Sequence, residues 1–173
     1  MIDIEVMETS HVTIGQNVSI LSYFLLPKGD YRTDLLSIGL DPGTVNTGIT
    51  LIDPTEKYWA CRQIKIKRDK NPVERIKTFF NLIDEICHTY EGMSYMTIEG
   101  PAFSESYRQV ELAEVRTVAA LWAIHLEAEV QYYTPQTIRK RIFGDGKIKA
   151  HEFWTNLPAD AAASLSCALM PLI

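Results

Sequence analysis

Three carboxylates in this chain occupy positions where enzymes commonly hold reactive groups. Asp41 and Glu99 each close a short apolar run, and Asp160 stands where a helix is expected to begin. Carboxylates brought together repel one another, so such a cluster is costly unless divalent cations neutralise it. Oxygen ligands suit Mg²⁺ or Mn²⁺, and two such ions about 4 Å apart can activate water for phosphodiester hydrolysis. The pattern therefore predicts an acidic metal site for phosphoryl chemistry.

Each position also has a plain structural explanation. An aspartate before Pro-Gly, as at Asp41, is often a turn residue, and one near a helix start, as at Asp160, is often a cap. Glu99 is harder to explain in this way, because an acid directly after the apolar residues 96–98 has little solvation reason to be there. Glu99 is therefore the strongest of the three indications.

The composition is that of an ordinary globular domain, with 173 residues of which 46% are apolar and 23% charged. No apolar run reaches about 18 residues, which excludes a transmembrane helix, and acids stand where a signal peptide carries bases. The cysteines lie far apart without CxxC spacing, which indicates a reducing compartment. We therefore expect a cytoplasmic protein with no membrane partner.

The net charge of −5 argues against nonspecific coating of nucleic acid. The charge is uneven, however, because residues 131–151 hold five basic residues against one acidic residue, a net of +4. A DNA-facing patch is therefore compatible with the acidic average.

The apolar spacing predicts a mixed α/β sheet. For example, Val73, Ile76, Phe80, Ile83 and Cys87 recur at intervals of three and four, which predicts a helix. Three leading strands with short loops favour an antiparallel meander, and βα crossovers follow. The expected elements are strands over residues 36–41, 47–53 and 58–67, a helix over 72–90, a strand over 96–99, a helix over 104–127, a strand over 130–133, and helices interrupted at residues 144–146.

The sequence pattern predicts that residues 1–34 form a separate β extension and that residues 35–173 form the main domain. Ile2, Ile4 and Val6 alternate with acids, Val18–Leu26 is mostly apolar, and the turn cluster Pro27–Asp30 follows. An edge hairpin, a partner-binding arm and an insertion all fit this pattern.

Four segments carry recognisable motifs, in this order along the chain: Ile38–Gly48, Ile98–Phe103, Pro135–Gly146 and Asp160–Leu165. Together they resemble the motifs of the RuvC family of crossover-junction endonucleases. Ile38–Gly48 resembles its Asp-Pro-Gly-x-x-x-Thr-Gly motif, and Ile98–Phe103 its Ile-Glu pair followed by an aromatic. Pro135–Gly146 resembles its Pro-x-x-Val-Lys-Lys…Gly-x-Gly stretch, and Asp160–Leu165 its closing Asp-Ala-Ala-Asp-Ala-Leu. The resemblance spans residues 36 to about 170. It implies a ribonuclease-H-like fold, with a mixed five-stranded sheet flanked by helices, and a metal-dependent resolvase of four-way (Holliday) DNA junctions.

The resemblance assigns roles to the acidic residues. Asp41 would bridge two ions, Mg²⁺ or Mn²⁺, while Glu99 would bind one ion and Asp160 the other. The family carries a second aspartate three residues after the last one, whereas this chain has Ala163, which supplies no ligand. We therefore expect hydrolysis to be severely impaired. Ala163 marks either a natural loss of activity or an engineered inactivating change, and its family-like surroundings favour the engineered change.

The resemblance also implies DNA contacts. Phe103 would stack into the opened junction, although core packing explains it equally well. Arg108 and Arg116 fit either a DNA contact or a structural role. The basic residues that would contact phosphates, or form an ordinary solvated face, are Arg139, Lys140, Lys147 and Lys149.

A symmetric homodimer is expected, because two nicks in opposed strands need two active sites related by a two-fold axis. The resemblance places the dimer surface on the helix over residues 104–127. The side chains expected to form it are Val115, Val118, Ala119, Trp122 and Ile124.

Other functions stay open beside this one. A catalytically silent, nuclease-derived module that binds DNA or protein is supported by Ala163. A sugar-kinase-like or chaperone-like nucleotide binder shares the Asp-x-Gly start but needs two such domains, for which the chain is short. A small nuclease that processes ribosomal RNA precursors shares that start too, but the residues around Glu99 and Asp160 fit RuvC better. The short C-terminal region favours a phage or mobile-element member, and no small-molecule substrate is expected.

Overall fold

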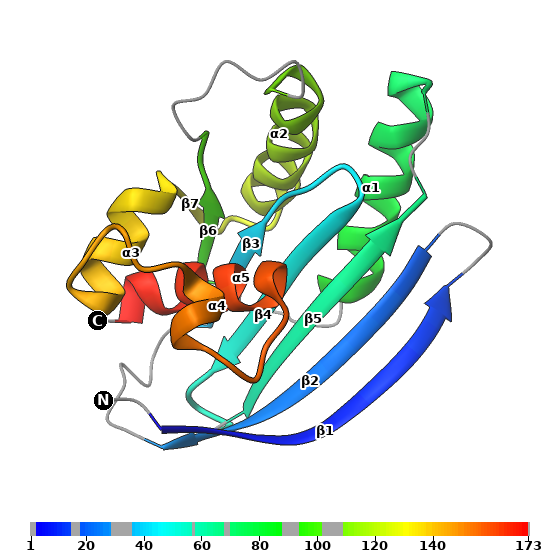
Figure 1. The fold of residues 1–173 in the computed structure, drawn as a ribbon. Coiled ribbons are helices and arrows are strands. Elements are labelled where there is room, and N and C mark those ends of the chain that lie inside the picture. The colour runs from blue at the N-terminus through cyan, green and yellow to red at the C-terminus, as the bar shows by residue number, and fades with distance from the viewer. Residues whose placement is uncertain are drawn as a thin grey trace.

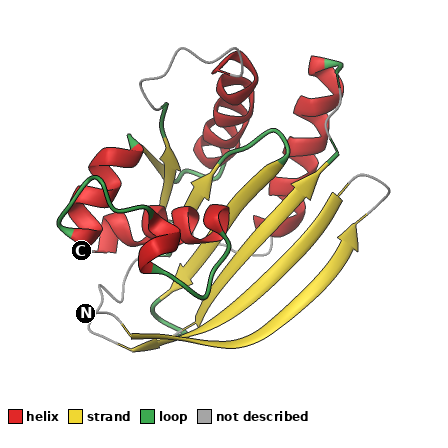
Figure 2. Cartoon of the chain, in the orientation of Figure 1, coloured by secondary structure: helices red, strands yellow, loops and turns green. Residues whose placement is uncertain are grey.

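The computed structural model describes residues 3–14, 18–28, 36–56, 58–67, 70–87, 94–101 and 109–172, the first two segments by their backbone alone. The strands are β1 (Asp3–Ile14), β2 (Val18–Lys28), β3 (Ser37–Asp41), β4 (Asn46–Asp53), β5 (Tyr58–Ile66), β6 (Tyr95–Glu99) and β7 (Glu129–Tyr133). The helices are α1 (Pro72–Cys87), α2 (Gln109–His125), α3 (Pro135–Phe143), α4 (Ala150–Phe153) and α5 (Ala159–Leu169), followed by the 3-10 turn η1 (Met170–Leu172). Figure 2 shows these helices and strands in separate colours.

In the described residues the strands form one seven-stranded sheet, in the order β1-β2-β5-β4-β3-β6-β7 (Figure 1). Strands β3, β4 and β5 form the predicted antiparallel meander, and β6 and β7 extend it in parallel from β3. The expected five-stranded mixed sheet is therefore confirmed. The N-terminal extension forms an edge hairpin, which is one of the three arrangements that the sequence left open. Strand β2 pairs with β5, and β1 pairs with β2. The division into two units at residue 34 stays a prediction.

Helices cover both faces of the five-stranded part of the sheet (Figure 1). Apolar side chains of β3, β4, β5 and β6 pack against α1 and α2 on one face. On the other face, α5 packs on side chains that include Ile52, Trp59 and Cys61, with α4 beside it. This is the two-sided cover that parallel strands need. None of the described helices is long and apolar enough to cross a membrane.

Helix α1 forms where the apolar spacing predicts a helix, but most of the apolar residues on which that prediction rests face solvent. Val73, Ile76 and Phe80 are exposed. The side chains that pack on the sheet belong to a neighbouring stripe of Phe79, Leu82, Ile83 and Ile86. Helical periodicity cannot choose between two overlapping apolar stripes, because both satisfy the same spacing.

Helix α2 ends at His125 rather than at Glu127, because Leu126 and Glu127 form a tight turn in which Glu127 has a φ of 58°. The expected dimer side chains Val115, Val118, Ala119 and Trp122 are buried in the core of the chain itself. The expectation that they form an intermolecular surface is therefore wrong. Ile124 is the one member of the expected set that is exposed. Two other apolar residues of α2, Val110 and Leu121, are exposed as well.

Helix α3 has well-defined ends. The hydroxyl of Thr134 accepts a hydrogen bond from the backbone N–H of Thr137, and Pro135 occupies the first turn. Gly144 ends the helix with a φ of 80°, and its N–H donates to the carbonyl of Lys140. These caps hold α3 over the C-terminal half of α5, where Ile138 packs against Cys167.

Helix α5 runs along β3 in close register. The hydroxyl of Ser37 donates to the carbonyl of Ala168, and a Cβ on Gly39 would lie 2.0 Å from the carbonyl oxygen of Ser164. Four helical residues advance about 6 Å and two strand residues about 6.6 Å, so the contacts stay matched along both elements. The next step along the helix, four residues before Ser164, is Asp160. The packing of α5 therefore carries Asp160 to the end of β3.

We expect Gly39→Ala to lower the free energy of unfolding by about 2–3 kcal/mol, because the new methyl group would meet backbone atoms of Ser164 and Ala168 that cannot rotate away. Urea denaturation followed by circular dichroism measures the change. Asn81→Ala, on the exposed side of α1, is the control and should stay within about 0.5 kcal/mol of the parent chain. Equal effects of the two substitutions would contradict the close contact.

Candidate active site

Asp41 and Glu99 lie side by side because their strands are neighbours. Strands β3 and β6 are parallel, and Leu40 pairs with Ile98 directly before the two acids. Both acids are the last residues of their strands. The carboxyl ends of adjacent parallel strands are where ligands meet open α/β sheets. The sequence expectation that strand ends bring these two carboxylates together is consistent with this geometry.

Asp160 reaches the same place from helix α5, which covers one face of the sheet. Asp41 pairs with Gly48 across β3 and β4, and a Cβ on Gly48 would lie 1.8 Å from the backbone carbonyl oxygen of Asp160. The first turn of α5 therefore rests directly on β4 beside Asp41. No residue with a side chain fits at position 48 without displacing Asp160.

The electrostatics of the site reflect this crowding. Burial, then the charges of Glu99 and Asp160, raises the pKa of Asp41 well above its usual value. Burial likewise raises the pKa of Glu99 to about 7, with the charge of Asp160 acting in the same direction. The charges of Glu99 and Asp160 thus make Asp41 harder to ionise, and the charge of Asp160 does the same to Glu99, as expected where acids gather at a functional site.

Two arginines oppose this repulsion. Arg116 of α2 donates from Nε to the carbonyl of Glu99 at 2.9 Å and from a terminal nitrogen to the carbonyl of Gly100 at 3.3 Å. Burial lowers the pKa of Arg116, and the charges of Glu99 and Asp41 counteract that effect. Arg139 of α3 acts on both carboxylates and lowers the pKa of each. Arg116 and Arg139 thus replace part of the positive charge that the carboxylates need.

Ala163 lies one helical turn after Asp160 and is half-buried. Cys167 follows one turn later on the same side of α5, and its pKa is raised by burial and then by the charges of Glu99 and Asp41. The strip of α5 that carries Ala163 and Cys167 therefore faces the Glu99 side of the site. A carboxylate at position 163 would extend the acidic cluster in that direction.

The chemistry of the donor set fits a hard divalent cation, since the converging side chains offer only carboxylate oxygens. The side chains lie farther apart, however, than the ligands of one bound ion. Among the described residues, no three side chains of His, Cys, Asp or Glu gather closely enough to hold one ion. Asp41, Glu99 and Asp160 are therefore neighbouring acids whose side chains, as they lie in this structure, do not form a closed set of ligands.

The structure separates the other expected site residues. Arg139 lies at the site, while Lys140, Lys147 and Lys149 are exposed beyond it. Phe103 and Arg108 lie outside the described residues. Arg116, which sequence left between two roles, belongs to the site through its contacts with the end of β6.

Gln63 is a site residue that sequence reasoning missed. It lies on β5 opposite Gly48, and its Nε2 donates to Oδ2 of Asp160 at 2.8 Å. The signal was present in the strand pattern: Trp59 and Cys61 are buried on the face of β5 that packs against α5, and the next residue on that face is the polar Gln63. A polar residue that continues a buried face indicates a specific partner.

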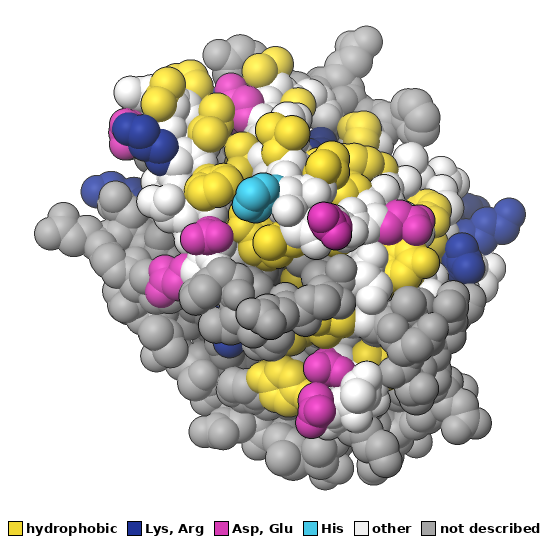
Figure 3. Space-filling view, turned by 180° about the vertical axis from the view of Figure 1, so that it is seen from behind, with side chains coloured by type: hydrophobic (Ala, Val, Ile, Leu, Met, Phe, Trp, Pro, Cys, Tyr) yellow, Lys and Arg dark blue, Asp and Glu magenta, His cyan; other side chains and the backbone are white. Residues whose placement is uncertain are grey.

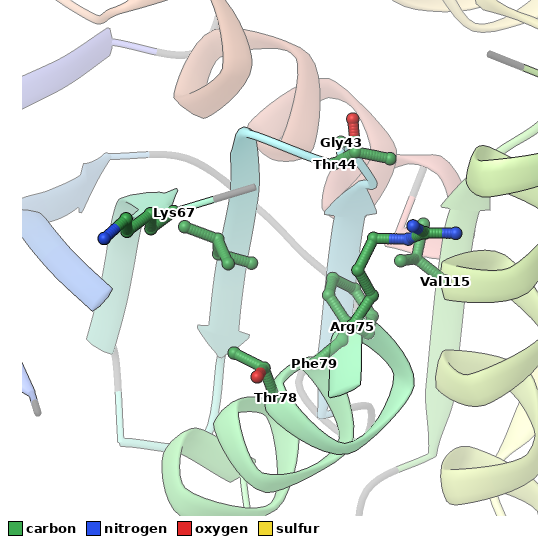
Figure 4. Close-up of a pocket in the computed structure, with 8 residues that line it drawn as sticks. Gly43, Thr44, Lys67, Arg75, Thr78, Phe79 and Val115 are labelled. Carbon is green, nitrogen blue, oxygen red and sulfur yellow. The ribbon is translucent and has the colours of Figure 1, made fainter. Parts of the chain in front are cut away.

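A pocket lies near the loop that follows Asp41, on the side of the sheet covered by α1 and α2 (Figure 4). Gly43 and Thr44 form one wall, and Arg75 extends from α1 toward α2, where it pairs with Glu114 at 2.8 Å. None of the three site carboxylates lines this pocket. The pocket is therefore distinct from the acidic cluster.

The raised pKa of Glu99 predicts how stability depends on pH without metal. Between its ordinary value of 4.5 and about 7, the unfolded chain releases the Glu99 proton while the folded chain retains it. The free energy of unfolding contributed by this group therefore falls as pH rises through that window. In EDTA, we expect Glu99→Gln to lose less stability than the parent chain between about pH 5 and pH 8, measured by urea denaturation. Parallel profiles for the two proteins would contradict the raised pKa.

Comparisons with known proteins agree with this architecture. The family model described as "Crossover junction endodeoxyribonuclease RuvC" matches residues 37–153, which include Asp41, Glu99 and Arg139 but end before Asp160. Thermus thermophilus RuvC has a similar structure, with a TM-score of 0.64 over 78% of this chain and 92% of that one, at 16% identity. The same protein in complex with a Holliday junction substrate gives a TM-score of 0.60, at 14% identity. At these identities the likeness shows the fold.

Sequence relatives carry the same family description. The RuvC of Dechloromonas aromatica is 29% identical over 145 residues, covering 76% of this chain and 81% of that protein. The RuvC of Wigglesworthia glossinidia brevipalpis is 31% identical over 116 residues, covering 65% and 71%. For the RuvC of Salinibacter ruber the identity is 23%, and this chain spans 64% of that protein's length. With the carboxylates at the strand ends and a family model that matches more than half of its length, the chain belongs to the RuvC family of crossover junction endodeoxyribonucleases.

Proposed function

We propose that this chain is built as a metal-dependent, structure-selective endonuclease that hydrolyses phosphodiesters in four-way DNA junctions. The observation that carries the proposal is that Asp41, Glu99 and Asp160 lie as neighbours at one edge of the sheet, in a chain of this family. The structure of Thermus thermophilus RuvC with a Holliday junction substrate supports branched DNA as the partner. We also propose that the enzyme is cytoplasmic.

The three carboxylates would hold Mg²⁺ or Mn²⁺, with two ions in a site that also has a carboxylate at position 163. A bound divalent cation supplies the chemistry that activates water and stabilises the leaving oxygen. Asp41 would be the central ligand, because the charges of both other acids act on it. Arg116 holds the end of β6 by its carbonyls and so orients Glu99.

Positive side chains would position the DNA. The charge of Arg139 acts on Asp41 and Glu99, and its side chain would contact the phosphate nearest the cut. Lys140, Lys147 and Lys149 are exposed and would contact flanking phosphates, which fix the register of DNA without reading its sequence. Phe103 and Arg108 stay predicted DNA contacts, as the sequence resemblance implies.

Ala163 leaves this site one carboxylate short. The remaining three acids face two arginines, so less negative charge is available to attract a second cation. We therefore propose that the chain as it stands cuts slowly or only binds. A catalytically silent module that holds branched DNA is the second candidate, and Ala163 is the observation that favours it.

Ala163→Asp should increase junction cleavage by roughly 10-fold or more, since a lost ligand or its support typically costs that much. The assay uses labelled four-way junctions with Mg²⁺ and with Mn²⁺, beside duplex DNA, single-stranded DNA and structured RNA. Paired symmetric nicks from the Ala163→Asp variant and tight, silent binding by the parent are expected.

Asp41→Asn in the same background is the control for contaminating nuclease. Junction binding by both chains with cleavage by neither would favour the silent module. A preference for structured RNA would contradict the proposed substrate.

We also propose a homodimer that joins two sites about a two-fold axis. Seen from the side of α1 and α2, hydrophobic side chains spread over much of the described surface (Figure 3). On α2, Val110 is 70% exposed, Leu121 61% and Ile124 60%, and their spacing puts them on one face. On α1, Val73 and Phe80 add exposed apolar area. Exposed apolar surface of this kind is typical of a protein interface.

Leu121→Lys should convert a dimer into monomers, because a charge in the centre of an apolar interface loses its hydration without gaining a partner. Sedimentation velocity over a range of protein concentrations measures the change. Lys77→Ala, an exposed substitution outside the apolar set on α1, should leave the oligomeric state unchanged. A monomeric parent chain would contradict the proposed interface.

A further inference from the structure

We propose that Gln63 is a positioning residue for the metal site, which orients the Asp160 carboxylate toward the cation. The inference rests on the proposed function in one respect, namely that Asp160 is a metal ligand. Nothing in the family motifs that this chain matches points to Gln63.

The geometry places Gln63 and Asp41 on opposite sides of Asp160. Asp41, Gly48 and Gln63 form one row across β3, β4 and β5, since Asp41 pairs with Gly48 and Gly48 with Gln63. The first turn of α5 rests on the central Gly48. Asp160 therefore lies over Gly48, which has no side chain, between the Asp41 carboxylate and the Gln63 amide.

The hydrogen bond from Gln63 gives the two oxygens of the Asp160 carboxylate different roles. Oδ2 accepts from Nε2 of Gln63 at 2.8 Å, so Oδ1 is the oxygen that would bind a cation. An amide is suited to this role, because it donates a hydrogen bond without adding charge. A lysine in the same place would compete with the cation for the carboxylate.

Asp160 depends on this contact more than an aspartate in a complete site would. The neighbouring position on α5 is Ala163, so no second carboxylate of the helix shares the cation. The helix start offers no side-chain cap, since its N-cap residue is Pro158. Among the described contacts, the bond from Gln63 is what sets the direction of the Asp160 side chain.

Both partners are also anchored, so the bond has a defined direction. Gln63 belongs to a strand paired on both sides, with β4 and with β2. Asp160 is held through α5, whose Ser164 hydroxyl lies 2.8 Å from the buried hydroxyl of Thr50. Support of this kind behind a metal ligand typically changes metal affinity or activity by about 10- to 100-fold.

The test measures metal binding without DNA. Mn²⁺ is titrated into the full chain and followed by isothermal titration calorimetry and by the electron paramagnetic resonance signal of free Mn²⁺. Gln63→Met keeps the length of the side chain and removes its donor. Gln131→Met is the matched control, because the Gln131 amide also donates to a carboxylate, Oε1 of Glu129, at 2.8 Å on β7. We expect about 10- to 100-fold weaker Mn²⁺ binding for Gln63→Met and no change for the control.

A double-mutant cycle separates positioning from general support of the fold. In an Asp160→Ala background, Gln63→Met should have no further effect on Mn²⁺ affinity, because its only route to the metal has been removed. A further loss in that background, or unchanged affinity in the single variant, would overturn the inference. So would a parent chain that does not bind Mn²⁺.

Failure of the proposed nuclease has a different outcome. If the Ala163→Asp chain cuts no junction while Gln63→Met still weakens Mn²⁺ binding, the proposed reaction is wrong and the role of Gln63 stands. Circular dichroism confirms that each variant is folded before titration.

Discussion

Helix α5 touches the sheet backbone to backbone, and the arrangement of the acidic site depends on that contact. At Gly39 and Gly48 the absence of a side chain lets the helix approach β3 and β4 to a distance that any Cβ would prevent. The buried hydroxyls of Thr50 and Ser164, 2.8 Å apart, and the bond from Ser37 to Ala168 hold the helix at that distance. Because α5 is thus fixed in register with β3, its first turn delivers Asp160 to the strand end where Asp41 and Glu99 already lie. A helix displaced outward by one methyl group would separate the carboxylates.

In the resulting site, which is partly buried, the negative charges of the acids are balanced in part by two arginines. Burial and the charges of neighbouring acids raise the pKa of Asp41 and Glu99, while Arg116 and Arg139 oppose the rise. These arginines come from helices on opposite faces of the sheet, α2 and α3, so both layers of the fold contribute to one cluster. Ala163 removes negative charge from this balance and Gln63 adds a neutral donor. The site is therefore less acidic than four carboxylates would make it, and it retains the oxygen donors that a divalent cation prefers.

The two helical layers differ in how much of their apolar surface the monomer uses. Helix α5 is buried along nearly its whole length, as its run of small residues allows. Helices α1 and α2 bury one stripe each and leave a second apolar stripe outside. That difference follows from position, because α5 has α3 and α4 beside it, whereas α1 and α2 pair mainly with each other and the sheet. The exposed stripes are the apolar surface on which the proposed homodimer would form.

Sequence by itself determined the order and type of the elements from Ser37 onward, since strand alternation, Pro135, Gly144 and the helical spacings are local signals. It also determined which acids stand at element ends, since Asp41 and Glu99 close their strands whatever the tertiary structure. Only the tertiary structure decided which of two apolar stripes on α1 and α2 faces the core, because both stripes satisfy helical periodicity. Only the tertiary structure, too, brought Gln63 to Asp160 and Arg116 to the end of β6. Such contacts join residues 97 and 17 positions apart through packing that local spacing does not encode.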